Sequence, residues 1–323
     1  MDNELKNWQV DLFEKIKPQI PHHENMVFVL SELLNVSENS IYKRIRGEQI
    51  ISIEEFILLK EKFLLLKYPF KSDDSVRKIF EVDYLNIDNK TSTLLDYVQA
   101  LNHNLRLVTQ DSNHQLFYAA KDLPVFYFFV FPEIAAFKFY TWKRSVFYLD
   151  EYKQRKFCLK TEINKDEIRE GEKLSLAYFD CNSTEIWCEE TFNSLIRQLE
   201  YSKSIDLFED EKDYFLLKEK MLQLIDFIET QTANGKKMNG KFEMYNHEML
   251  LYDNSALAVM NHGKVSFVTH NTSNILQIND EMFCNQTMQY LEKLIFHSVP
   301  LSKSNEKSRL LFFKKIKLKI TAI

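Results

Sequence analysis

Hydroxyl, amide and cationic side chains recur closely between residues 37 and 46, and such groups can bind nucleic acid. Asn can form two hydrogen bonds with adenine, and Lys or Arg can bond guanine. Cations also bind phosphate, which supplies most of the affinity for DNA and its salt dependence. We expect Asn39, Ser40 and Tyr42 to contact base edges. We expect Lys43, Arg44 and Arg46 to contact phosphates. Ser37 is expected to cap the helix and to leave the backbone amides of the helix N-terminus near a phosphate.

Two short helices joined by a tight turn would position these side chains, one over residues 26–34 and one over residues 37–46. Ser31 is small where the two helices must cross, Asn35 tolerates the left-handed backbone of a turn, and Ser37 is a good N-cap. Gly47 is expected to end the second helix. The apolar residues that would hold the two helices together are Val36, Ile41 and Ile45.

This stretch resembles the helix-turn-helix of the Cro and phage-repressor superfamily, the Xre-like regulators. The matching residues are Leu30, Ser31, Leu34, Val36, Ser37, Ser40 and Ile41. Residues 42–48 with 52–55 also resemble a variant common in regulators from Bacteroidetes. Asn35 replaces the usual Gly of the turn, and the usual Gln at the start of the second helix is not evident. The resemblance covers about residues 8–66 and implies binding of double-stranded DNA as a homodimer.

Length and composition place this segment in a larger globular protein. The chain has 323 residues, 45% of them hydrophobic, and a net charge of −5, so DNA contact must come from a local basic surface. We expect an α+β protein: an all-α helix-turn-helix domain over residues 1–68, a linker at residues 67–74, and a larger helix-rich α+β domain over residues 75–323. The larger domain is expected to carry a small antiparallel sheet near the C-terminus, and a subdivision near residues 235–240 is an open alternative.

Hydrophobic periodicity gives the elements expected in these domains. The expected helices cover residues 8–16, 26–34, 37–46, a segment from Ser52, a segment from Thr93, and residues 124–130, 132–147, 185–201, 209–232, 281–296 and 306–320. The expected strands cover residues 116–120, 156–161, 174–178, 241–245, 249–252, 256–260 and 264–269. Capping boxes are predicted at Ser52 with Glu55 and at Thr93 with Asp96.

Several kinds of site are excluded by residue spacing. The 5 glycines are too scattered for a phosphate-cradling loop, and no two of the 4 cysteines have C-x-x-C spacing. Residues 262–264 resemble the H-x-K start of phospholipase-D-type active sites, but Thr269 and His270 stand where the required Asp is expected, and a hairpin turn is expected at residues 261–263. We therefore expect no catalytic residues, no metal and no cofactor. The polar N-terminus and the lack of a long apolar run predict a cytoplasmic protein without a membrane contact.

Two further segments have alternative interpretations. Residues 303–319 carry seven cations and one acid above an apolar stripe; we favour a docked amphipathic helix over a second phosphate or lipid contact. The aromatic residues between 126 and 142 fit a core, but they could also line a pocket for a small apolar molecule, with Trp142 and Tyr140 as candidates.

The sequence as a whole predicts a one-component transcription regulator and not an enzyme. Its first domain would bind DNA, and the second would sense a small molecule, form the dimer, or both. Two other classes remain open: an enzyme, such as a nuclease-like effector, with an appended DNA-binding domain, and an adaptor that uses the helical domain to bind protein.

Overall fold

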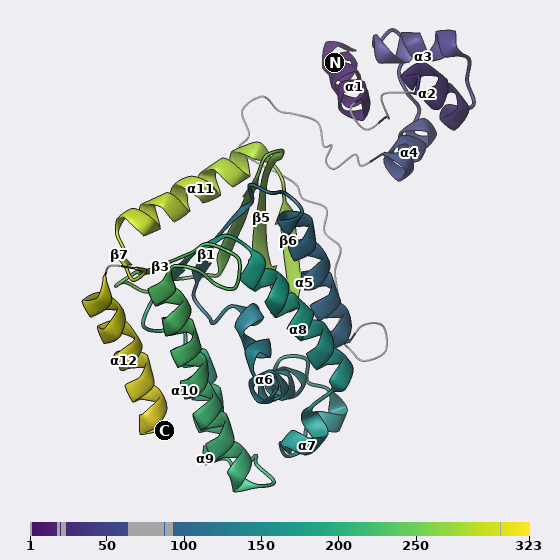
Figure 1. The fold of residues 1–323 in the computed structure, drawn as a ribbon. Helices are drawn as coiled ribbons and strands as arrows, with labels where there is room; N and C mark the ends of the chain where they lie inside the picture. Colours follow the sequence, from purple (N-terminus) through teal and green to yellow (C-terminus); the bar gives the residue numbers. More distant parts are fainter. Residues whose placement is uncertain (1, 18–19, 21–23, 64–86, 88–92, 304) are drawn as a thin grey trace. The chain divides into compact units, whose positions relative to one another are not determined.

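The structure is a computed structural model, and it describes residues 2–17, 20, 24–63, 87, 93–303 and 305–323 (Figure 1). The chain divides into two compact units, residues 1–82 and residues 83–323. Helices combine with one seven-stranded sheet, so the protein is of the α+β class. The linker expected at residues 67–74 lies outside the described residues.

The first unit is helical over its described residues. Its helices are α1 (Asp2–Ile16), α2 (Met26–Leu34), α3 (Glu38–Ile45) and α4 (Ile53–Lys62). Their apolar faces share one core, in which Leu12, Ile41 and Leu59 are fully buried. The predicted capping box begins α4: the side chains of Ser52 and Glu55 each bond the other residue's backbone amide.

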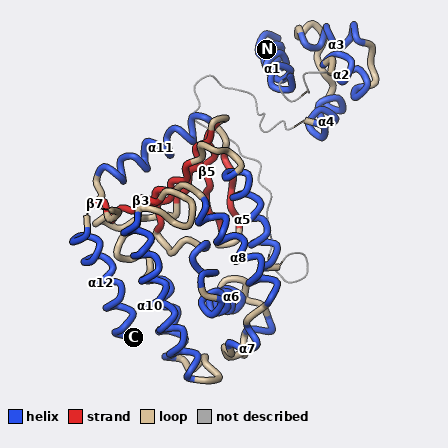
Figure 2. Tube along the Cα trace, viewed as in Figure 1, coloured by secondary structure: helices blue, strands red, loops and turns tan. Residues whose placement is uncertain are grey.

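A single mixed sheet, red in Figure 2, forms the centre of the second unit. Its strand order is β6-β5-β4-β1-β2-β3-β7. The strands are β1 (Gln115–Ala120), β2 (Ser183–Trp187), β3 (Phe242–Asn246), β4 (Ser255–Met260), β5 (Gly263–His270), β6 (Asn274–Ile278) and β7 (Val299–Pro300). β1, β2 and β3 are parallel, and the other neighbouring pairs are antiparallel. The antiparallel strands expected near the C-terminus therefore extend a larger mixed sheet. Asn261 and His262 form the predicted hairpin turn between β4 and β5.

Helices cover both faces of this sheet (Figure 1). One core collects side chains from α5 (Leu94–Thr109), η2 (Val125–Val130), α6 (Pro132–Ser145), η3 (Asp150–Tyr152), α7 (Leu159–Glu162), α8 (Lys165–Asp180), α9 (Asn193–Ser204), α10 (Glu211–Asn234) and α12 (Glu306–Ala322). On the opposite face lies α11 (Glu281–Phe296), whose Cys284 and Leu291 pack with Ile186 and Leu257 of the sheet. Of the helices in the described ranges, none combines the length and apolarity needed to cross a bilayer.

Four sequence predictions in this unit are wrong. Residues 174–178 belong to α8, residues 156–161 run into α7, and residues 249–252 form no strand. The helix predicted from residue 185 begins only at Asn193, because residues 183–187 form β2. Alternation of polar and apolar residues does not reveal β2, because both faces of this strand are buried and neither face is marked by a row of exposed polar residues.

Glu185 of β2 is fully buried at the middle of the sheet. Its carboxylate accepts hydrogen bonds from the hydroxyls of Tyr127 (2.7 Å) and Tyr178 and from Nε1 of Trp187 (2.8 Å). The buried amine of Lys237 lies 4.0 Å from the carboxylate and 3.4 Å from the centroid of the Tyr178 ring. Burial, and then the charge of Glu185, raise the pKa of both phenols, and burial lowers the pKa of Lys237 to about 8.

The basic C-terminal segment is a docked helix, as the favoured interpretation predicts. α12 packs against α10 with Phe313 and Ile316 fully buried. On its outer side, the Lys317 amine lies 2.7 Å from a carboxylate oxygen of Asp226 and 2.6 Å from one of Glu229. Lys317 is one of the cations that a phosphate or lipid contact would need, and it is already paired with these two carboxylates.

Candidate nucleic-acid interface

A short turn joins α2 to α3, and its backbone suits the residues that form it. Asn35 ends α2 with φ 51° and ψ 47°, in the left-handed region that Asn tolerates. Its N–H and that of Val36 both donate to the carbonyl of Ser31. The hydroxyl of Ser37 then caps α3 by accepting a hydrogen bond from the Ser40 amide at 3.3 Å. The turn therefore fixes where α3 begins.

α3 has one face in the core and one face exposed. Ile41 is fully buried, and Ile45 packs partly against the same core. The predicted contacts that are exposed on α3 and its C-cap are Asn39, Tyr42, Lys43 and Arg46. Residues three or four apart share one side of a helix, so these four side chains form a continuous row. Ser40 beside them is half-buried.

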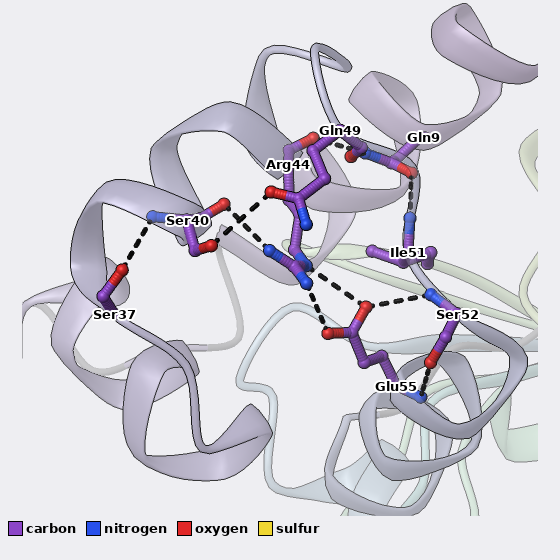
Figure 3. A network of polar contacts seen from close by, with 8 residues as sticks. All are labelled: Gln9, Ser37, Ser40, Arg44, Gln49, Ile51, Ser52 and Glu55. Atoms are coloured by element: carbon purple, nitrogen blue, oxygen red, sulfur yellow. Dashed lines mark hydrogen bonds and ion pairs between the residues drawn. The ribbon is translucent and has the colours of Figure 1, made fainter.

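Arg44 does not belong to this row, contrary to the expectation that it contacts phosphate. Its residue is 6% exposed, and its guanidinium donates to both carboxylate oxygens of Glu55, from Nη2 at 2.7 Å and from Nε at 3.1 Å. Nη1 also donates to the carbonyl of Ser40 at 3.2 Å (Figure 3). Because Glu55 also accepts from the Ser52 amide at 2.9 Å, Arg44 ties α3 to the first turn of α4. Its role is structural.

The pKa of Glu55 reflects its contact with Arg44. Partial burial raises the pKa of Glu55, but the hydrogen bonds from Arg44 and the Ser52 amide outweigh it and leave the pKa below its ordinary value. Glu55 is therefore ionised at neutral pH, as a charge-assisted pair with Arg44 requires.

Gln9 of α1 also holds the C-terminal end of α3, and it was not among the residues predicted from the sequence. The side chain is fully buried, and its Nε2 donates to the carbonyls of Arg44 (2.6 Å) and Gln49 (2.8 Å). Its Oε1 accepts from the amide of Ile51 at 2.8 Å (Figure 3). One signal could have revealed it: Gln9 stands seven residues before the buried Ile16, on the apolar stripe of α1, where a polar side chain needs a buried partner.

Gly47 allows this close approach. Its φ is 66°, and a Cβ there would lie 2.5 Å from Cγ of Lys6 and 3.2 Å from the Lys6 carbonyl oxygen. Any larger residue would push α1 away from the end of α3, so Gly47 ends α3 as predicted and also lets α1 pack against it.

The exposed row is not strongly basic. Arg46 forms a bidentate ion pair with Glu48, at 2.7 and 3.0 Å, and the two side chains are 54% and 48% exposed. This hydrogen-bonded pair raises the pKa of Arg46 and lowers that of Glu48. Within the described residues the side chain of Lys43 forms no ion pair, so it is the cation of the row most available to a phosphate.

The charges and side chains of the first unit limit which ions it could bind. Residues 1–63 carry eight Lys and Arg side chains against eleven Asp and Glu side chains, so any anion must be bound through the row and not through a broad positive field. In the described part of the chain, no three His, Cys, Asp or Glu side chains are grouped so that they could hold a metal ion.

Comparison with known proteins assigns the chain to no family. No protein-family model, no curated protein and no solved structure matches it.

Proposed function

We propose that the chain is a transcription regulator whose α3 enters the major groove of double-stranded DNA. One observation carries the proposal: Asn39, Tyr42, Lys43 and Arg46 form an exposed row on a helix whose opposite face is fixed by the core. The resemblance of residues 8–66 to Xre-like regulators supports the same function and a cytoplasmic site of action.

The chemistry of the row suits both kinds of contact that such a helix makes. Asn39 and Tyr42 can hydrogen-bond base edges, and Asn is suited to adenine. Lys43 and Arg46 can bind phosphates and so supply affinity and register. The contacts from Gln9 and Arg44 hold the C-terminal part of α3, so little ordering is needed before DNA binds, and less of the binding energy is lost to entropy.

The proposed regulator acts as a homodimer. Two copies of α3 would read half-sites about 34 Å apart, one turn of the duplex. The second unit would hold the dimer, receive a signal, or do both, because a change in the spacing of the two helices changes affinity for a fixed operator.

Selection of bound sequences from a random DNA pool, with the full-length protein at two salt concentrations, tests the proposal. We expect one palindromic motif. Lys43→Gln should weaken binding to it by a similar factor for all sequences and reduce the slope of log affinity against log salt by about one. Asn39→Ala should instead relax the preference at one base position in each half-site.

Lys212→Gln is the matched control, since it removes the same charge from an exposed residue of α10 in the second unit. It should leave affinity and salt slope unchanged. The proposal is wrong if no motif is enriched, or if Lys43→Gln and Lys212→Gln have the same effect.

A further inference from the structure

The second unit contains a cavity of about 370 Å³ between its sheet and the helices beside it. Side chains from α5, η2, α6 and α9 line one side, and side chains from β1, β4, β5 and β6 line the other. Binding sites for small molecules commonly have volumes of about 300–1,000 Å³. The cavity is therefore large enough for a compact organic ligand.

Most of the cavity wall is apolar and aromatic. Trp142 lines it, with the Tyr97 and Phe128 rings set edgewise at centroid distances of 5.8 and 6.2 Å. Phe267 of β5 contributes from the sheet. Tyr140, the other aromatic candidate, is fully buried elsewhere and donates its hydroxyl proton to the carbonyl of Arg155 at 2.6 Å. Only an apolar ligand body would gain from displacing water here.

Lys138 of α6 brings a positive charge into this apolar wall, although its residue is only 5% exposed. Its amine donates to Oε1 of Gln198 at 2.9 Å and to Oγ of Ser194 at 3.5 Å, and both acceptors also line the cavity. The amine lies 5.3 and 5.8 Å from the ring centroids of Phe128 and Trp142. Among the residues that the structure describes, no carboxylate forms an ion pair with it.

Such an arrangement is unfavourable in the protein alone. A buried cation whose hydrogen-bond partners are all neutral costs free energy, and a lysine is expected to be in an ion pair when it is buried. Lys138 has three N–H donors, of which two are used within the described residues. Burial lowers its pKa to about 8, against the opposing effect of Asp122, so the amine is still mainly charged at neutral pH.

We propose that this cavity binds an apolar small molecule that carries one carboxylate, and that the carboxylate pairs with Lys138. The carboxylate takes the third donor and replaces the missing counter-ion, while the apolar body contacts Trp142 and Phe267. Asp122, a half-buried residue of the same lining, repels a second negative charge. This selects a monocarboxylate over a dicarboxylate.

The site would give the proposed regulator a ligand, but the inference does not require DNA binding. Binding to the cavity is measured directly on the full-length protein, so failure of either proposal leaves the other open to its own test.

Titration calorimetry with 2-naphthoate, decanoate and 2-naphthamide tests the inference. The first two share a carboxylate on an aromatic and an aliphatic body, and the amide has the shape of 2-naphthoate without its charge. We expect at least one carboxylate to bind at least tenfold more tightly than 2-naphthamide. Lys138→Met should remove this preference and keep the melting temperature equal or higher, while Asp122→Asn should tighten carboxylate binding.

Lys220→Met is the matched control. This lysine also lies over an aromatic ring, 5.2 Å from the centroid of Phe131, but it does not line the cavity. It should leave carboxylate binding unchanged. The inference is overturned if neither carboxylate binds, if the amide binds equally well, or if Lys138→Met keeps the preference.

Discussion

Replacing Arg44 with Met should destabilise the first unit strongly. The side chains of Arg44 and Glu55 are only 7% and 14% exposed, and two hydrogen bonds join them at 2.7 and 3.1 Å. Removing one partner of a buried pair costs about 3–5 kcal/mol, because the other charge is left without its counter-ion; Glu55 is only partly buried. Since Glu55 keeps its hydrogen bond from Ser52, we expect the lower end of this range, about 3 kcal/mol.

The expected loss is large for a unit of this size. For a domain of 60–100 residues, 1 kcal/mol shifts the melting temperature by about 4–8 °C, so the first unit should melt about 12–24 °C lower in Arg44→Met. Adding Glu55→Gln should recover part of the loss. Gln can serve at this position of a capping box as well as Glu, and no unpaired charge is then left inside.

Arg46→Met is the matched control, because Arg46 forms the same bidentate geometry with Glu48 at the surface. Exposed ion pairs contribute little to stability, so this variant should melt like the wild type. If Arg46 contacts phosphate as proposed, the variant should bind DNA more weakly. Arg44→Met, measured well below its melting temperature, should keep most of its DNA affinity.

Fluorine NMR of protein labelled with 5-fluorotryptophan can follow the units separately. Trp8 lies on α1 with its ring centroid 5.6 Å from that of Phe56 in α4, whereas Trp142 and Trp187 belong to the second unit. Arg44→Met should move only the transition of Trp8. A wild-type melting temperature for this variant, or an equal loss in Arg46→Met, would refute the assignment of Arg44 to the interior.

Three further results are expected. Glu48→Gln should tighten DNA binding and steepen the slope of log affinity against log salt by about one, because it frees Arg46 from its ion pair. Gel-shift titrations at several salt concentrations measure both quantities. Unchanged binding would argue against Arg46 as a DNA contact. Gln9→Leu should destabilise the first unit by about 2 kcal/mol, since it leaves the buried amide of Ile51 without a partner and removes the hydrogen bonds to the carbonyls of Arg44 and Gln49, and urea denaturation reports the loss. The second unit should become more stable between about pH 8 and 9.5, because Lys138 and Lys237 have a pKa of about 8 when folded but about 10.5 when unfolded. Thermal melts across this range should show a smaller rise in melting temperature for Lys138→Met than for the wild type. An equal rise in both would contradict the lowered pKa of Lys138.

The sequence predicts the first unit well because its signals are local. The caps Ser37 and Ser52 and the turn residues Asn35 and Gly47 each act within a few positions. The role of Arg44 could not be predicted in this way. A cation on a short helix looks the same in sequence whether it faces solvent or a carboxylate eleven residues away.

The second unit depends on partners that are distant in sequence. β2 contains Ser183, Thr184 and Glu185, and this polarity resembles a helix surface, although all three residues are buried. Their burial is possible because Tyr127, from 58 residues away, bonds the carboxylate. The cavity is similar: the aromatic segment of residues 126–142 supplies one wall, but the other walls come from strands that no local pattern connects to it.

The buried carboxylate of Glu185 limits where the second unit can be truncated. Its neighbours β1 and β3 come from either side of β2 in the chain, and Lys237 follows α10. A fragment ending near residue 235 would lack both β3 and this amine, and would leave the carboxyl group of Glu185 at an open sheet edge. Versions of this unit that end before β3 should therefore fail to fold instead of yielding a smaller stable module.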